Sequence, residues 1–194
     1  MLKMEDNSEK EFQKNQAYAV KFIKPEIIIG EIGIAEGSVV ADFGCGGGYF
    51  SLPVAKKIGE NGLVHALDIL PQSLEMIAGY AKTMGLTNIV TKRVNLEKEG
   101  GSTLKEGSCD WVIMKGMLFQ NKDKGMIVRE AQRVLRVGGK ILVIEWDNKD
   151  FSIGPDRSLR IPKEALLEII QEAGMSVLKE IAVSDFHYGL VLVK

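Results

Sequence analysis

Short apolar runs alternate with amphipathic helical stretches along most of this chain, and this alternation is the feature that most constrains its fold. The predicted strands cover 38–43, 63–67, 89–94, 110–114 and 140–146, and predicted helices over 51–58, 71–84 and 124–136 lie between some of them. Strands separated by crossover connections pair in parallel. Two last strands, 176–183 and 188–193, follow a helix over 162–173 and are joined too tightly for a crossover, which predicts an antiparallel hairpin. The sequence therefore predicts a doubly wound, Rossmann-like α/β sheet of seven strands, mostly parallel with an antiparallel C-terminal strand.

Residues at the helix ends give these limits a physical basis. Ser51 is placed to cap the N-terminus of the first helix of this series. Gly138 and Gly139 are placed to end the helix 124–136, because glycine adopts the left-handed conformation common at helix C-termini.

The length of 194 residues suggests one domain, 1–194, with little room beyond a single core. Residues 1–36 are expected to form an N-terminal helical lid segment, and 37–194 the α/β core. Helical sequence over 11–33 is broken by Pro25, which suits the first turn of a second short helix ending near Gly30 or Gly33. A lid made of 1–30 and 147–161 is expected to define the substrate.

The composition excludes few functions, but it limits the expected binding partners and cellular location. A formal net charge of −1 gives no general attraction to nucleic acid or to an anionic membrane, so a nucleic-acid partner is not expected. The sequence contains no apolar run of membrane-spanning length and no signal-peptide core at its N-terminus. Cys45 and Cys109 form no metal-spaced pair, so no metal site is predicted and a cytoplasmic location is expected.

The run VVADFGCGGGYFS, residues 39–51, follows the first predicted strand and holds four glycines within five positions. The dinucleotide fingerprint G-x-G-x-x-G fails here, because Tyr49 and Ser51 stand where its third glycine would be. The run instead reads D-x-G-x-G-x-G, formed by Asp42, Gly44, Gly46 and Gly48.

The acid in this run favours one ligand over another. A carboxylate at Asp42 would repel the pyrophosphate of a dinucleotide and favour a ligand with cationic groups, such as S-adenosylmethionine with its ammonium and sulfonium. Asp68, 20 residues after Gly48, can accept hydrogen bonds from both ribose hydroxyls. Ribose-binding acids at this spacing also occur in nicotinamide enzymes, so Asp68 does not separate the two cofactors.

Four segments in order carry a family resemblance that covers nearly the whole chain from about Pro25: ADFGCGGGYFS, VHALDI, CDWVIMKGMLFQ and AQRVLRVGGKILVIEW. They resemble the first motif, the acidic second strand, the fourth strand and the fifth-strand region of class I S-adenosylmethionine-dependent methyltransferases. Within that group the chain is most similar to the small methyltransferases related to the menaquinone and ubiquinone C-methylating enzymes (methyltransferase type 11-like). The resemblance implies S-adenosylmethionine as the cofactor.

The resemblance also implies which residues bind that cofactor. Gly44, Cys45 and Gly46 would contact the methionine portion, and Asp68 with Ile69 would hold ribose and flank adenine. The chain departs from the family twice. Asn95, followed by Leu96, replaces the usual acid that meets the adenine amino group, and Lys115 stands beside the donor where relatives have a small polar residue or an acid. A cation there is expected to turn toward solvent or toward an acidic substrate.

The acceptor side is defined less sharply by the sequence. Phe119 and Gln120 follow the fourth strand and are expected to line the pocket, while His187, a candidate general base, is expected near its mouth. Further residues expected at this mouth are Asp147, Arg160 and Tyr188, with Arg160 meeting an anionic substrate or pairing with Glu145 or Asp156.

The function predicted from these features is methyl transfer from S-adenosylmethionine to a small molecule. The alternatives are a protein or RNA acceptor, a non-catalytic S-adenosylmethionine-binding protein and an oxidoreductase using a nicotinamide cofactor. The sequence leaves open the acceptor, the atom methylated and the oligomeric state.

Overall fold

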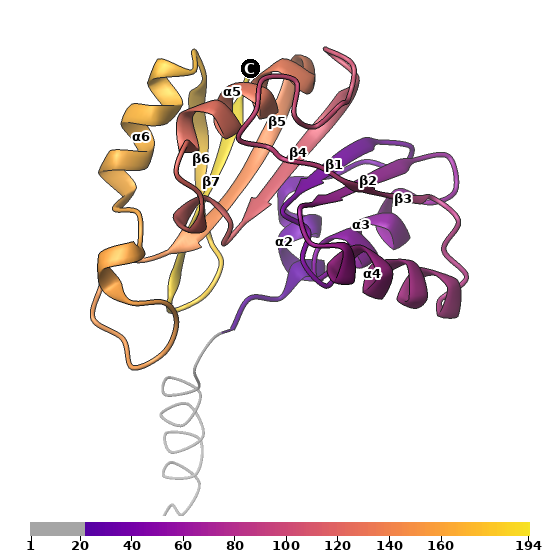
Figure 1. Ribbon diagram of the computed structural model, residues 1–194, viewed down its shortest axis with the longest axis horizontal. Helices are drawn as coiled ribbons and strands as arrows, with labels where there is room; N and C mark the ends of the chain where they lie inside the picture. Colours follow the sequence, from indigo (N-terminus) through magenta and orange to yellow (C-terminus); the bar gives the residue numbers. More distant parts are fainter. Residues whose placement is uncertain (1–21) are drawn as a thin grey trace, which may run out of the picture.

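One seven-stranded sheet runs through the protein, and the computed structural model describes residues 22–194 of it (Figure 1). Its strands are β1 (Val39–Phe43), β2 (Leu63–Asp68), β3 (Ile89–Arg93), β4 (Cys109–Lys115), β5 (Leu135–Trp146), β6 (Ser176–Ala182) and β7 (His187–Val193). Its helices are α2 (Pro25–Ile32), α3 (Ser51–Ile58), α4 (Pro71–Thr83), α5 (Lys124–Val134) and α6 (Lys163–Glu172), with 3-10 turns η1 (Leu118–Gln120) and η2 (Arg157–Leu159).

The strand order is β3-β2-β1-β4-β5-β7-β6, which confirms the predicted doubly wound topology. Strands β1 to β5 pair in parallel, and β7 is antiparallel to both of its neighbours, β5 and β6. The order reverses between β1 and β4. Ligands of such sheets bind beyond the carboxyl ends of the strands at this reversal, so the fold itself marks the place of a site.

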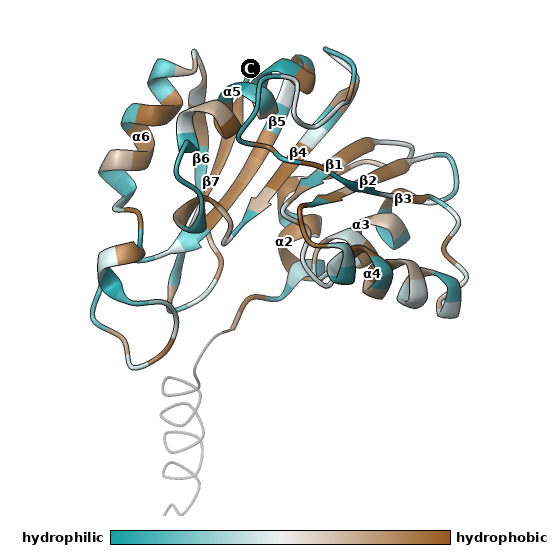
Figure 2. Ribbon diagram, in the orientation of Figure 1, coloured by the Kyte–Doolittle hydropathy of each residue, from teal (hydrophilic) through white to brown (hydrophobic). Residues whose placement is uncertain are grey.

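Helices cover both faces of the sheet, as the hydropathy colouring of Figure 2 illustrates with brown central strands and mixed helices. On one face α2 and α3 pack against alternate strand residues such as Val40, Ile113 and Ile144. On the other face α5 and α6 pack against the intervening residues, among them Ala41 and Met114. Burial on both faces explains why the central strands read as continuous apolar runs rather than alternating ones.

The described part of the N-terminal segment contains the short helix predicted to begin near Pro25. Helix α2 begins at Pro25 and ends before Gly33, whose φ of +74° is left-handed. Its buried residues Ile28 and Ile29 join the core beneath the sheet. The helical sequence expected over 11–21 lies outside the described residues, and the division into lid and core remains a prediction.

Two predicted helix ends were wrong. Phe50, not Ser51, occupies the N-cap of α3, because the Ser51 hydroxyl instead donates a 2.6 Å hydrogen bond to buried Asp42. Strand β5 begins at Leu135, directly after α5, so Gly138 and Gly139 lie inside the strand rather than at a helix end. The left-handed Gly138, with φ +73°, belongs to an irregular stretch where the β4–β5 register shifts.

Within 22–194, no helix combines the length and the apolar character needed to cross a bilayer.

Candidate functional site

The loop after β1 is anchored by backbone hydrogen bonds to the end of β2. The N–H groups of Gly44 and Cys45 both donate to the carbonyl oxygen of Leu67. Gly44 has φ +69°, and a Cβ there would lie 2.9 Å from the Cβ of Met117, which belongs to the loop after β4. Glycine is therefore required at this position both for backbone conformation and for the close approach of the two loops.

Asp68 ties the glycine loop to the end of β2. One carboxylate oxygen accepts a 2.9 Å hydrogen bond from the Gly46 N–H, and the other accepts a 2.9 Å bond from the Leu70 N–H. Each oxygen keeps a further lone pair for a ligand hydroxyl. The carboxylate at the predicted ribose position thus also holds the loop that would contact the rest of the ligand.

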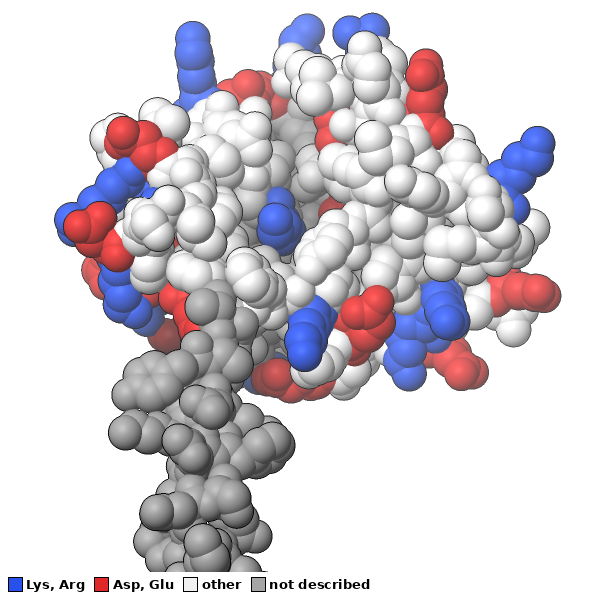
Figure 3. Space-filling view, turned by 90° about the horizontal axis from the view of Figure 1, so that it is seen from below, with Lys and Arg blue, Asp and Glu red and all other residues white. Residues whose placement is uncertain are grey.

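A cavity of about 570 Å³ opens between these loops and the segments that follow β3 and β4. Its volume is in the range of small-molecule sites. Figure 3 views the molecule from the carboxyl ends of β4 and β5 and shows a hollow in this face, with the blue of Lys or Arg visible inside it. The sequence-predicted residues that line the cavity are Gly44, Cys45, Gly46, Asp68, Ile69, Asn95, Leu96, Lys115 and Gln120.

Eight lining residues were missed by the sequence reasoning: Gly47, Tyr49, Leu70, Ser73, Val94, Gly116, Met117 and Asn121. Most of them are neighbours of predicted residues and could have been found from loop continuity. Met117 could not be found in this way, because its close approach to Gly44 depends on how β4 and β1 pair.

Asp42 and Gly48 do not line this cavity. Asp42 is buried behind the loop, where burial, and next the nearby carboxylate of Asp68, raise its pKa to about 6, with the Ser51 hydrogen bond opposing. Gly48 lines an adjacent hollow between α2, the glycine loop and α4. The electrostatic effect expected of Asp42 would therefore act from behind the loop rather than by contact.

Cys45 and Asn95 line the cavity, and each also has contacts within the fold. The Cys45 side chain packs with Ala66, Leu74 and Ile77, and burial raises the pKa of its thiol. The Asn95 side-chain oxygen accepts a 3.0 Å hydrogen bond from the Glu97 N–H. An unreactive thiol agrees with a structural rather than chemical role for Cys45.

Glu145 is a buried acid beside the cavity that the sequence indicated only as a partner for Arg160. Its side chain is fully buried, and one carboxylate oxygen accepts a 2.8 Å hydrogen bond from the Leu118 N–H at the start of η1. The other oxygen has no hydrogen-bond partner within the described chain. Burial raises the Glu145 pKa to about 7, opposed first by the backbone N–H groups of Leu118 and Met117.

His187, the predicted base, is enclosed by aromatic and cationic groups. Its ring stacks on Trp146 with centroids 4.1 Å apart, its Nδ1 lies 2.7 Å from the Ser184 hydroxyl, and its Nε2 is buried without a partner among the described residues. Burial first, then the charges of Lys115 and Arg160, lowers its pKa to about 4. His187 is therefore neutral at pH 7, and it does not line the donor cavity.

Arg160 holds a loop rather than pairing with Glu145 or Asp156. Its guanidinium donates hydrogen bonds of 2.9–3.1 Å to carbonyl oxygens across the connection between β5 and α6, those of Asp147, Lys149, Ile153 and Pro155. It also lies over the rings of Trp146 and Phe151. These contacts give the loop 147–160 a defined shape beside His187.

Three other residues lie outside the donor cavity: Asp147 and Tyr188, predicted at its mouth, and Phe119, predicted to line it. Asp147 pairs with Lys149 at 2.7 Å. Tyr188 donates a 3.0 Å hydrogen bond to the Ile161 carbonyl, and Phe119 packs against the core on the α5–α6 side. Because neighbouring residues on β7 face opposite sides of the sheet, Tyr188 and His187 belong to different faces.

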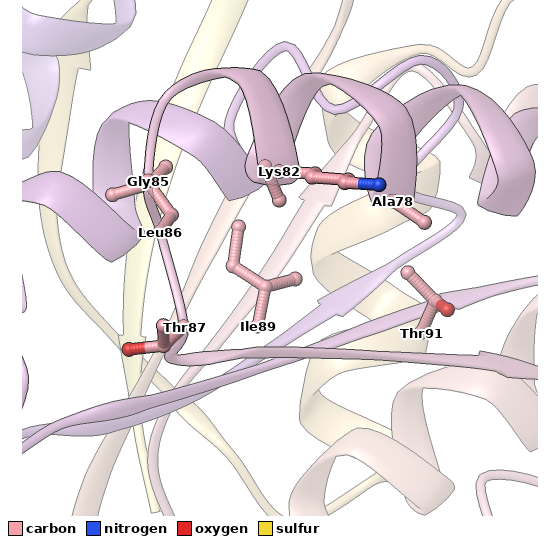
Figure 4. Close-up of a pocket in the computed structure, with 8 residues that line it drawn as sticks. Ala78, Lys82, Gly85, Leu86, Thr87, Ile89 and Thr91 are labelled. Atoms are coloured by element: carbon pink, nitrogen blue, oxygen red, sulfur yellow. The ribbon is translucent and has the colours of Figure 1, made fainter.

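A third hollow lies between α4 and β3 (Figure 4). Its labelled residues are aliphatic or hydroxyl-bearing apart from Lys82. Across residues 22–194 no cluster of His, Cys, Asp and Glu could hold a metal ion. Among the hollows of the described chain, the cavity at the topological switch point is therefore the best candidate for a functional site, because charged and polar side chains line it.

The fold and this cavity define the class of doubly wound α/β proteins that bind a ligand at the topological switch point. The profile of the methyltransferase-domain family matches residues 34–175, and the chain belongs to that family. Two curated relatives are aklanonic acid methyltransferase DauC of Streptomyces sp. (39% identity over 139 residues; 70% of this chain, 61% of the relative) and the ubiquinone/menaquinone biosynthesis C-methyltransferase UbiE of Haemophilus ducreyi (29% over 120 residues; 61% and 45%). The chain therefore spans less than two thirds of either relative.

A crystal structure of an S-adenosylmethionine-dependent methyltransferase from Aquifex aeolicus has the same fold. Its TM-score is 0.82 at 22% identity, and the match covers 89% of this chain and 91% of that one. The family match and this fold together confirm the resemblance predicted from the four motifs.

Proposed function

We propose that this protein transfers the methyl group of S-adenosylmethionine to a small molecule. The observation that supports it most is the joining of three loops, after β1, β2 and β4, around one cavity lined by Gly44, Asp68 and Lys115 in a chain of the methyltransferase-domain family. In this proposal the glycine loop and Asp68 bind the donor, with Ile69, Asn95 and Leu96 beside its adenosine. Asp42 acts through its charge.

Methyl transfer requires alignment of the two reactants and exclusion of water, and it needs few catalytic groups. The nucleophile attacks the methyl carbon in line with the leaving sulfur, and the sulfonium is already activated. The Met117–Gly44 contact and the Glu145–Leu118 hydrogen bond fix the cavity wall, and thereby the donor. His187 remains the candidate base, although its low pKa makes it a weak one.

A small-molecule acceptor is proposed over a macromolecular one on three grounds. The chain is nearly neutral, the cavity of about 570 Å³ has the size of a small-molecule site, and both named relatives have names that specify small acceptors. Two buried free cysteines fit the proposed cytoplasmic location.

The test is transfer of labelled methyl from S-adenosylmethionine into a fractionated cell extract. We expect label in the low-molecular-weight fraction. Label confined to protein or RNA would show that the acceptor is a macromolecule and not a small molecule. Absence of label despite donor binding would favour a non-catalytic binding protein. A thermal-shift comparison of S-adenosylmethionine with NAD separates the proposal from a nicotinamide oxidoreductase.

A further inference from the structure

Among residues 22–194, one ammonium group, that of Lys115, lies in the wall of the proposed donor cavity. Lys115 ends the central strand β4 and lines the cavity together with Gly44 and Tyr49. Its Nζ lies 5.8 Å from the centroid of the Tyr49 ring, which is itself largely exposed at the cavity edge. None of the ion pairs among residues 22–194 includes Lys115.

Two nearby carboxylates favour the charged form of Lys115, although no residue among 22–194 forms an ion pair with it. Partial burial lowers its pKa, and the carboxylates of Glu145 and Asp42 act in the opposite direction. Neither carboxylate forms an ion pair with Lys115 among the described residues: one Glu145 oxygen accepts from the Leu118 N–H, and Asp42 accepts from the Ser51 hydroxyl. The ammonium can therefore still take an anionic partner from a ligand.

Strand geometry sets the side toward which Lys115 projects. On β4, Trp111 and Ile113 pack into the core on the α2–α3 face, so Lys115 projects to that same face. Trp146 of β5 and His187 of β7 stack together on this same face. The residues that alternate with Trp146 along β5 face the other side of the sheet. Lys115 thus lies between the glycine loop on one side and this aromatic pair on the other.

We infer that Lys115 makes the acceptor site selective for an anionic nucleophile, such as a phenolate, enolate, carboxylate or thiolate, over a neutral amine. This inference rests on the proposed methyl transfer. The bound anion's electron pair forms the bond to the methyl carbon, the S–CH₃ bond breaks with its electrons going to sulfur, and both products are neutral at the reacting atoms. The acceptor's proton leaves to solvent before transfer, and Lys115 keeps its own.

An amine acceptor would be disfavoured by the same charge. A neutral amine that takes a methyl cation becomes a cation, which would develop beside the Lys115 ammonium. Like charges in a partly buried site repel strongly enough to change rates and affinities severalfold. The lysine also weakens the binding of the cationic donor relative to its neutral product, S-adenosylhomocysteine.

The first test measures the affinities of S-adenosylmethionine and S-adenosylhomocysteine for the wild type, Lys115→Met and Lys115→Arg by calorimetry. The two ligands differ in the sulfonium charge and the methyl group. We expect Lys115→Met to bind S-adenosylmethionine roughly three- to tenfold more tightly, with S-adenosylhomocysteine unchanged, and Lys115→Arg to behave as the wild type. Lys122→Met, at an exposed position outside the cavity, is the matched control for a change in net charge.

Two outcomes of this titration would overturn the inference. If Lys115→Met weakens the binding of both ligands equally, the ammonium binds the carboxylate that both ligands carry. If neither affinity changes, the Lys115 charge does not act on the bound ligand. If the wild type binds neither ligand, the proposed function itself fails, which is a different result.

The second test concerns the acceptor class. Labelled products made from the small-molecule fraction of a cell extract are passed over a cation exchanger at acidic pH. We expect the label to flow through, as methylated oxygen, carbon or sulfur compounds without an amine. Label retained as methylated amines would overturn the inference while leaving methyl transfer intact.

Discussion

The Glu145 carboxylate accepts a 2.8 Å hydrogen bond from the Leu118 N–H, joining the end of β5 to the turn that follows β4. Both residues are fully buried. The same turn carries Met117, which closes against Gly44, so the buried acid supports the cavity wall without lining it. Glu145 is accordingly a positioning residue.

Replacing Glu145 tests this support. Glu145→Ala leaves the Leu118 N–H unpaired, which we expect to cost about 1–3 kcal/mol of stability and to weaken S-adenosylhomocysteine binding. Glu145→Gln keeps an acceptor oxygen and should retain binding. Urea unfolding and calorimetry of both variants check the difference; equal binding by Glu145→Ala and wild type would contradict the positioning role.

The raised pKa of Glu145 also predicts a pH dependence. The unfolded carboxyl ionises near 4.5 and the folded one near 7, so the unfolded state loses its proton first and stability falls as pH rises through this window. Glu145→Gln should abolish a loss of up to about 3 kcal/mol between pH 4.5 and 7. A wild type and a variant with parallel stability profiles over this range would be the opposing result.

Asp42→Asn should separate stability from donor binding. The folded pKa of about 6 means that ionised Asp42 destabilises the fold above that pH, so the neutral variant should be more stable at pH 7.5. Loss of the negative charge behind the glycine loop should weaken S-adenosylmethionine binding more than S-adenosylhomocysteine binding. This is opposite in sign to the expectation for Lys115→Met, and calorimetry with both ligands measures it.

Removing His187 should make the protein more resistant to acid. The folded pKa of about 4 lies below the ordinary value of 6.5, so the unfolded state binds the proton first and stability falls as pH drops from 6.5 toward 4. His187→Gln should flatten this loss of up to about 3 kcal/mol. An acid loss in His187→Gln that equals or exceeds that of the wild type would contradict the assignment.

Gly44→Ala and Gly46→Ala form a matched pair in the glycine loop. Both glycines have positive φ, but only at Gly44 would a Cβ meet another atom, 2.9 Å away on Met117. We expect Gly46→Ala to cost about 1 kcal/mol in backbone strain and Gly44→Ala several times as much, with loss of donor binding. Equal thermal stabilities would show that the two loops can separate freely.

The sequence predicted the topology well because the two-faced burial of the central strands leaves a continuous apolar pattern in β1, β4 and β5. Gly44, Asp68 and Asn95, which the sequence predicts as cofactor-binding residues, line one cavity because each lies at or just after the end of a strand near the switch point.

What the sequence could not predict depends on side-chain partners distant in the chain. Ser51 looked like a helix cap because its hydrogen bond to Asp42 is invisible without the fold. Gly138 looked like a helix stop because a bulge in β5 and a helix C-terminus demand the same left-handed glycine. Glu145 was read as a possible ion-pair partner, whereas β4–β5 pairing brings it to the Leu118 N–H.

The most direct measurement of the central claim is calorimetric titration of the protein with S-adenosylhomocysteine, beside the Gly44→Ala variant. The account predicts saturable binding of one ligand per chain to the wild type and its loss in the variant. Absence of binding to the wild type at millimolar ligand would contradict the account.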